Sequence, residues 1–193
     1  MKFFVNFLSV FRILAAFAII PMLMEQMFAA SFILFVLASV SDWLDGFLAK
    51  KFKVITKIGG VIDHMGDKFL VANALIMMVV FLQIWWVLVP AILMICRDLY
   101  VSGLREFMGT QKIAMPVPKQ RFSLGKVKTA AQMLALSCVF LWVWAVNADW
   151  SSEILTYDML FIGIGLLWIA LLFSLVSAGQ YTVEFIKNLK KIK

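Results

Sequence analysis

Charged residues are scarce in this sequence. Only 15% of its 193 residues are Asp, Glu, Lys or Arg, whereas roughly a quarter are charged in a typical soluble domain. Hydrophobic residues make up 64% of the chain, and its mean hydropathy is +0.97. This composition excludes an ordinary soluble domain and argues against nucleic-acid binding, despite a net charge of +7. It predicts a polytopic membrane protein.

Cysteine and histidine, the usual ligands of zinc, are also rare. The two cysteines, Cys96 and Cys138, both lie in apolar runs, where cysteine behaves as a small buried hydrophobic residue. We expect neither a disulfide nor a cysteine metal site. The one histidine, His64, follows Asp63 directly, so on a helix its side chain points away from the Asp63 face. We expect it to have a packing or interfacial role.

Long apolar segments organise the whole chain. An all-α fold with six transmembrane helices of about 20 residues fits the length, with no room for an additional soluble domain. The first segment imitates a secretory signal, but Arg12 interrupts it, so we expect it to remain as a membrane helix. Residues 1–193 should form a single integral-membrane domain. The six segments are 7–24, 31–49, 60–82, 86–108, 129–147 and 159–182.

Lysine and arginine are distributed unevenly between the ends of these segments. The connections around Glu25, around Gln83 and between Asn147 and Asp158 contain neither. The other connections and both termini are basic, so the positive-inside rule predicts that both termini lie in the cytoplasm. The basic residues are Lys2, Lys50, Lys51, Lys53, Lys57, Arg105, Lys112, Lys119, Arg121, Lys126, Lys128, Lys187, Lys190, Lys191 and Lys193.

Four aspartates stand out because an ionisable group in hydrocarbon is costly, by about 2.5–3.5 kcal/mol or more. Asp42 and Asp45 are three residues apart, and Asp63 and Asp67 are four apart, so each pair projects from one face of a helix. Both pairs fall near the cytoplasmic ends of adjacent antiparallel helices. We therefore expect the two pairs to converge.

Four converging carboxylates would repel one another unless a cation lies between them. Oxygen ligands without a nearby cysteine favour a hard ion, so Mg²⁺ or Mn²⁺ is preferred to zinc. The sequence predicts one or two bound cations at Asp42, Asp45, Asp63 and Asp67.

Four cations begin or end membrane segments on the same side as the aspartates. Arg97, Arg105, Lys126 and Lys128 could bind a phosphate group there. Two alternatives are open: the cations could anchor the helices at the cytoplasmic surface, or Arg105 could pair with a neighbouring carboxylate.

The aspartates form part of a longer pattern, Asp42-x-x-Asp45-Gly46-x-x-Ala49-Lys50, eight residues, then Gly59-x-x-x-Asp63-x-x-x-Asp67. It closely resembles the signature of the CDP-alcohol phosphatidyltransferases, D-x-x-D-G-x-x-A-R-x8-G-x3-D-x3-D. Seven of the eight fixed positions match across 26 residues. The departure is Lys50, where the family usually has arginine, so a bidentate phosphate contact is not assumed.

Other stretches are similar to the bacterial phosphatidylglycerophosphate synthases within that family. They are Asn6 to Arg12, Arg97-Asp98, Leu104-Arg105-Glu106, and Gly125 to Gln132. The resemblance implies transfer of a phosphatidyl group from CDP-diacylglycerol to sn-glycerol 3-phosphate, with release of CMP.

The resemblance also implies roles for particular residues. Asp42, Asp45 and Asp63 would be ligands of two Mg²⁺ or Mn²⁺ ions, and Asp67 would be the general base, itself close to a metal. Gly46, Ala49 and Gly59 would line the CDP-diacylglycerol pocket, with Lys50 as a phosphate contact. The phosphate of glycerol 3-phosphate would be held by the four cations Arg97, Arg105, Lys126 and Lys128.

The remaining expectations are a homodimer, implied by the resemblance, and a multi-pass protein of the bacterial cytoplasmic (inner) membrane with its active site facing the cytoplasm.

Inositol phosphate, serine or phosphatidylglycerol are alternative acceptors, because the signature describes the CDP donor. A transporter that uses intramembrane carboxylates as a relay is an alternative of another class. It is disfavoured because the second and third segments become apolar beyond the aspartates.

Overall fold

The protein is a bundle of α-helices, as the apolar segments predict. A computed structural model describes residues 2–52, 57–110, 124–148 and 153–189, with side chains except at 2–6, 43, 45–52, 57–58, 124–126 and 153–157. Those residues form six helices and no strand. The helices are α1 (Lys2–Met24), α2 (Phe28–Phe52), α3 (Lys57–Leu82), α4 (Trp85–Thr110), α5 (Leu124–Asn147) and α6 (Glu153–Leu189).

Five of the helices are long and apolar enough to cross a membrane. The exception is α2, whose described apolar part is the shorter stretch Phe28–Asp42. The all-α, multi-pass membrane fold expected from the sequence is confirmed. Each expected segment lies inside one observed helix.

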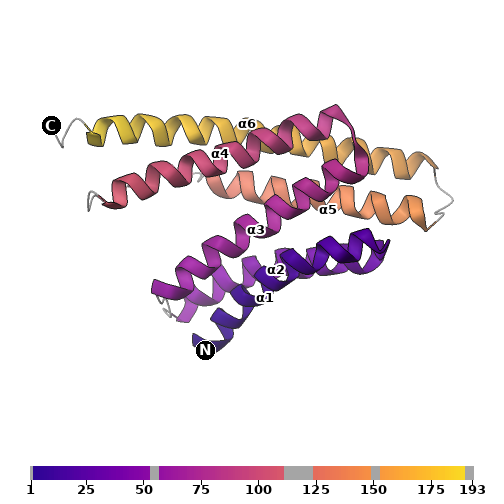
Figure 1. The fold of residues 1–193 in the computed structure, drawn as a ribbon, viewed down its shortest axis with the longest axis horizontal. Helices are drawn as coiled ribbons and strands as arrows, with labels where there is room; N and C mark the ends of the chain where they lie inside the picture. Colours follow the sequence, from indigo (N-terminus) through magenta and orange to yellow (C-terminus); the bar gives the residue numbers. More distant parts are fainter. Residues whose placement is uncertain (1, 53–56, 111–123, 149–152, 190–193) are drawn as a thin grey trace.

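The bundle has two groups of helices joined by α3. Helix α1 packs against both α2 and α3 in one group, and α5 and α6 pack against each other in the second. Helix α3 crosses from the first group towards α4 (Figure 1). Aromatic stacking of Phe35 on Phe140, with ring centroids 4.8 Å apart, connects α2 to α5.

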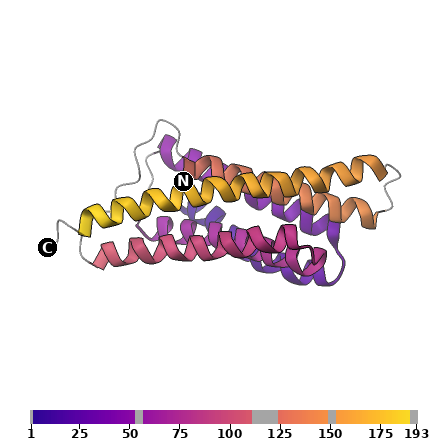
Figure 2. The ribbon, with the colours of Figure 1, turned by 90° about the horizontal axis from the view of Figure 1, so that it is seen from above.

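Two short turns reverse the chain at one end of the bundle. Gln26 (φ 60°) and Gln83 (φ 49°) follow α1 and α3 in the left-handed conformation that ends many helices. The opposite end gathers the first turns of α1, α3 and α5 and the last turns of α2, α4 and α6 (Figures 1 and 2). Of the basic residues in the described helices, Lys57, Lys126 and Lys187 lie in these terminal turns. Its cytoplasmic orientation stays a prediction.

Helix α6 packs closely on α5 at Gly163. A Cβ atom placed there would lie 2.8 Å from Val139 Cγ2 and 3.2 Å from the carbonyl oxygen of Ala135. In contrast, a Cβ atom at Gly165 would meet nothing within 4 Å. Small residues of this kind allow membrane helices to approach each other.

Gly163→Ala should therefore destabilise the protein, by about 1–3 kcal/mol, because the added methyl overpacks the α5–α6 contact. Gly165→Ala is the matched control and should change stability by less than about 1 kcal/mol. Thermal unfolding of both variants in detergent measures the difference. Equal stability of the two variants would contradict the close packing at Gly163.

Candidate active site

Three of the four aspartates meet at the end of the bundle where the basic segments begin. Asp42 of α2 and Asp63 and Asp67 of α3 each offer a carboxylate oxygen, and the three oxygens lie within 4.8 Å of one another. Between 27% and 44% of each aspartate side chain is exposed, so the cluster can be reached from outside the bundle. The predicted convergence of the two helices is confirmed for these three residues.

Helix α1 brings a cation into the same cluster. The Arg12 side chain is 0% exposed, and its Nη1 lies 3.0 Å from Asp42 Oδ1 and 2.9 Å from Asp63 Oδ1. The same nitrogen also contacts Asp67. In the sequence, Arg12 was noted as an interruption of an apolar segment and as the end of the stretch Asn6 to Arg12 that resembles the family, but it was given no role in the site. Its location in the membrane was the available signal, because a buried intramembrane arginine requires a carboxylate partner.

Gly66, which precedes Asp67, lies in the contact between α1 and α3, where a Cβ atom would be in ordinary van der Waals contact. A Cβ atom there would lie 3.4 Å from the carbonyl oxygen of Ser9 and 3.6 Å from Arg12 Cβ. Two turns further into the bundle, Asn73 Nδ2 donates to the carbonyl oxygen of Ala16 at 3.0 Å. These contacts set the position of Arg12 along the α1 axis relative to the aspartates of α3.

The donor set suits a divalent cation. When all are ionised, the three carboxylates and Arg12 leave a net charge of −2. Carboxylate oxygens are the ligands that hard ions prefer. The cluster could therefore hold a metal ion, as the sequence predicts.

Several predicted site residues fall where side chains are not described. Asp45, Gly46, Ala49 and Lys50 lie in the last part of α2, and Lys126 lies in the first turn of α5. Their side chains are outside the described residues. Gly59 is in the first turn of α3, one turn before Asp63.

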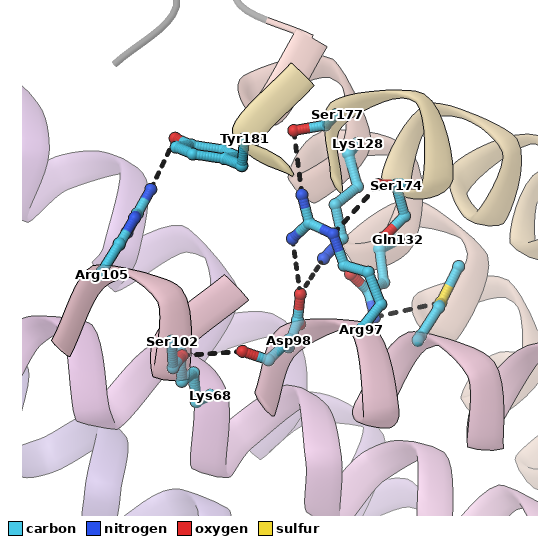
Figure 3. Close-up of polar contacts among 11 residues, drawn as sticks. Lys68, Arg97, Asp98, Ser102, Arg105, Lys128, Gln132, Ser174, Ser177 and Tyr181 are labelled. Atoms are coloured by element: carbon cyan, nitrogen blue, oxygen red, sulfur yellow. Dashed lines mark hydrogen bonds and ion pairs between the residues drawn. The ribbon is translucent and has the colours of Figure 1, made fainter. Parts of the chain in front are cut away.

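Two of the predicted phosphate-binding cations, Arg97 and Lys128, form a second cluster with Asp98, where α4, α5 and α6 meet (Figure 3). Asp98 Oδ1 accepts hydrogen bonds from Arg97 Nη1 at 2.7 Å and from Lys128 Nζ at 2.6 Å. Arg97 also donates from Nε to the carbonyl oxygen of Ser174 at 3.0 Å and from Nη2 to Ser177 Oγ at 2.9 Å. Arg97 therefore ties α4 to α6, and Asp98 ties it to α5.

Arg105 is held apart from this group, by an aromatic residue of α6. Its Nη2 donates to the Tyr181 hydroxyl at 2.6 Å, and its guanidinium carbon lies 4.8 Å from the centre of the tyrosine ring. Sequence reasoning did not select Tyr181. An aromatic partner two helices away leaves no local signal in the sequence.

Another cation, Lys68, lies between the two clusters and was also missed from the sequence. It follows Asp67 directly, and its ammonium group donates to Ser102 Oγ of α4. Ser102 Oγ in turn donates to the carbonyl oxygen of Asp98 at 2.7 Å.

The site combines carboxylates that can hold a metal with a nearby cluster of cations, on a helical bundle embedded in a membrane. This combination is suited to binding phosphate esters. Sequence comparison identifies the class. The family model described as CDP-alcohol phosphatidyltransferase matches residues 3–176, and the chain belongs to that family.

Individual relatives narrow the comparison further. The chain is 38% identical over 149 residues to the CDP-diacylglycerol–glycerol-3-phosphate 3-phosphatidyltransferase of Sodalis glossinidius, covering 77% of this chain and 74% of that protein. It is 38% identical over 154 residues to the protein of the same name from Escherichia coli K12, covering 80% and 76%. The corresponding Pectobacterium atrosepticum protein is 36% identical over 149 residues, covering 77% and 74%.

Proposed function

We propose that this chain transfers the phosphatidyl group of CDP-diacylglycerol to sn-glycerol 3-phosphate, forming phosphatidylglycerophosphate and CMP in phospholipid biosynthesis. The observation that carries the proposal is the meeting of Asp42, Asp63 and Asp67, three residues of the family signature. The names of the relatives supply the donor and the acceptor.

The reaction is the attack of an acceptor hydroxyl on the β-phosphorus of the donor, with CMP as the leaving group. Asp67 accepts the proton of that hydroxyl as general base. It lies beside Arg12 and two further carboxylates. Arg12 limits the repulsion among the carboxylates and fixes their spacing.

Asp42, Asp45, Asp63 and Asp67 would hold the metal, which we propose to be two Mg²⁺ or Mn²⁺ ions. Bound there, the ions would offset the negative charge that develops on the leaving CMP. Gly46, Ala49 and Gly59 line the pocket for CDP-diacylglycerol in this proposal, and Lys50 contacts a phosphate. The region of Arg97, Arg105, Lys126 and Lys128 attracts the phosphate of the acceptor.

The proposed setting is the bacterial cytoplasmic (inner) membrane, with residues 1–193 as one domain, both termini and the active site facing the cytoplasm, and two copies forming a homodimer. The basic ends of the helices support this orientation through the positive-inside rule. An active site that faces the cytoplasm also suits the two substrates, because the lipid donor stays in the membrane while the water-soluble acceptor arrives from the cytoplasm.

A transmembrane carboxylate relay is disfavoured by the interior beyond the aspartates. Between the cluster and the α1–α2 turn, the described residues Ile19, Leu23 and Phe35 are at most 1% exposed and apolar. Packed side chains of this kind exclude water. The carboxylates are therefore accessible from one end of the bundle.

The acceptor is tested by following CMP release from purified protein in detergent with CDP-diacylglycerol and Mg²⁺ or Mn²⁺. The panel of acceptors is glycerol 3-phosphate, inositol phosphate, serine and phosphatidylglycerol. We expect fast release with glycerol 3-phosphate only. Turnover with another alcohol, without turnover on glycerol 3-phosphate, would reject the proposed acceptor and favour another activity within the family.

A further inference from the structure

Helix α3 presents the proposed base and a lysine to different neighbours. Asp67 and Lys68 are consecutive, so their side chains point about 100° apart around the helix. Asp67 contacts Arg12 of α1, whereas the Lys68 ammonium donates to Ser102 Oγ of α4. Figure 3 shows Lys68 and Ser102 beside Asp98. Lys68 thus lies where the carboxylate cluster meets the cation cluster.

The neighbouring cations Arg97 and Lys128 already donate hydrogen bonds to acceptors within the protein. Arg97 donates to Ser174, Ser177 and Asp98, and Lys128 donates to Asp98. Lys68 differs, because within the described part of the chain it forms no ion pair and donates to a neutral hydroxyl. An ammonium group has three donors, so Lys68 can bind an anion without giving up its contact with Ser102.

Charge in this region is unbalanced. Lys68, Arg97, Arg105 and Lys128 are cations, and the carboxylate paired with them in the described residues is that of Asp98. These groups are close enough for the charge of Lys68 to interact with Asp98, Arg105 and Arg97. An excess of positive charge in a partly buried site attracts a doubly charged anion such as a phosphate monoester.

We infer that Lys68, supported by Ser102, binds the phosphate group of the acceptor and so contributes to acceptor specificity. The inference rests on the proposed function and deepens it. Because Lys68 adjoins Asp67, a phosphate at Lys68 places the hydroxyl of a short acceptor near the base. Glycerol 3-phosphate carries both a phosphate for Lys68 and a hydroxyl for Asp67, whereas an acceptor without phosphate has no group for Lys68.

The phosphate could instead belong to the diphosphate of the CDP donor, since the contact chemistry is the same. Steady-state kinetics separate the two sources when the concentrations of glycerol 3-phosphate and of CDP-diacylglycerol are varied in turn. The variants are Lys68→Gln, the conservative Lys68→Arg, and Lys187→Gln. Lys187 is an exposed lysine in the last turn of α6, outside the site, and serves as the matched control.

Lys68→Gln should raise the KM for glycerol 3-phosphate by roughly 10- to 100-fold, the loss expected for a hydrogen bond to a charged group. The KM for CDP-diacylglycerol should change less than about threefold, and Lys68→Arg should recover much of the lost affinity. Lys187→Gln should match the wild type. A merely structural role for Lys68 would lower thermal stability and disturb both KM values together.

Two results would overturn the inference. One is an unchanged KM for glycerol 3-phosphate in Lys68→Gln, and the other is a rise in the KM for CDP-diacylglycerol alone, which assigns the lysine to the donor. Failure of the proposed function is distinct, because the wild-type protein itself would then release no CMP with glycerol 3-phosphate.

Discussion

Asp67→Asn should abolish CMP release, lowering kcat by about a hundredfold to ten-thousandfold, which is the usual contribution of a general base. The amide is nearly isosteric with the carboxylate but cannot take the proton of the attacking hydroxyl. Asp42 of α2 and Asp63, on the preceding turn of α3, remain in place. The variant should therefore still bind the metal, which is measured as Mg²⁺-dependent thermal stabilisation in detergent.

The matched control for this substitution is Asp158→Asn, an exposed aspartate of α6 outside the carboxylate cluster. It should leave CMP release unchanged. A near-normal rate in Asp67→Asn would remove Asp67 from the role of base. Loss of both activity and metal-dependent stabilisation would make Asp67 chiefly a metal ligand.

Arg12→Met should strongly destabilise the metal-free protein, by about 3 kcal/mol, because removing one partner of a buried ion pair leaves the others unpaired. Arg12 contacts aspartates on both α2 and α3, so its loss leaves three carboxylates to repel one another. Mg²⁺ should recover more stability in this variant than in the wild type, since the ion supplies the missing positive charge. Thermal unfolding in detergent with and without Mg²⁺ measures both effects.

Leu14→Met is a suitable control, because Leu14 lies on the same helix with 64% of its surface exposed. It should unfold like the wild type. Arg12→Lys keeps the charge and should be intermediate. An Arg12→Met protein as stable as the wild type without Mg²⁺ would mean that Arg12 does not hold the cluster together.

Much of the fold could be predicted because a membrane imposes its thickness on apolar segments. The segment 60–82 lies within Lys57–Leu82, and 86–108 lies within Trp85–Thr110. The observed helices extend beyond these windows, most of all α6, which continues from 182 to Leu189. Hydropathy cannot detect such extensions, because a helix that leaves the hydrocarbon continues with polar residues.

The carboxylate cluster could be predicted because its spacing is a local property of two helices. Residues three or four apart share a helix face. The sequence alone therefore predicts that Asp63 and Asp67 lie side by side. Arg12 is 30 residues from Asp42 in the chain, and the packing of α1 against α2 and α3 brings it into the cluster. No local pattern contains that information.

The contacts of the cations, like those of Arg12, could not be predicted from the sequence. Their grouping at one end of the bundle follows from topology, but the sequence does not say which of them are already paired. Arg97 and Lys128 share Asp98, and Arg105 rests on Tyr181. Lys68 follows Asp67 but lies on a different face of α3, so the spacing of the aspartates does not point to it.

The central claim, that the acceptor hydroxyl attacks the donor phosphorus, is tested most directly by isotope transfer. Purified protein is given CDP-diacylglycerol and glycerol 3-phosphate in which only the primary hydroxyl group carries heavy oxygen, and the products are analysed by mass spectrometry. We predict that the label appears in phosphatidylglycerophosphate and that the released CMP is unlabelled. Labelled CMP, or a lipid product without the label, would contradict the proposed reaction.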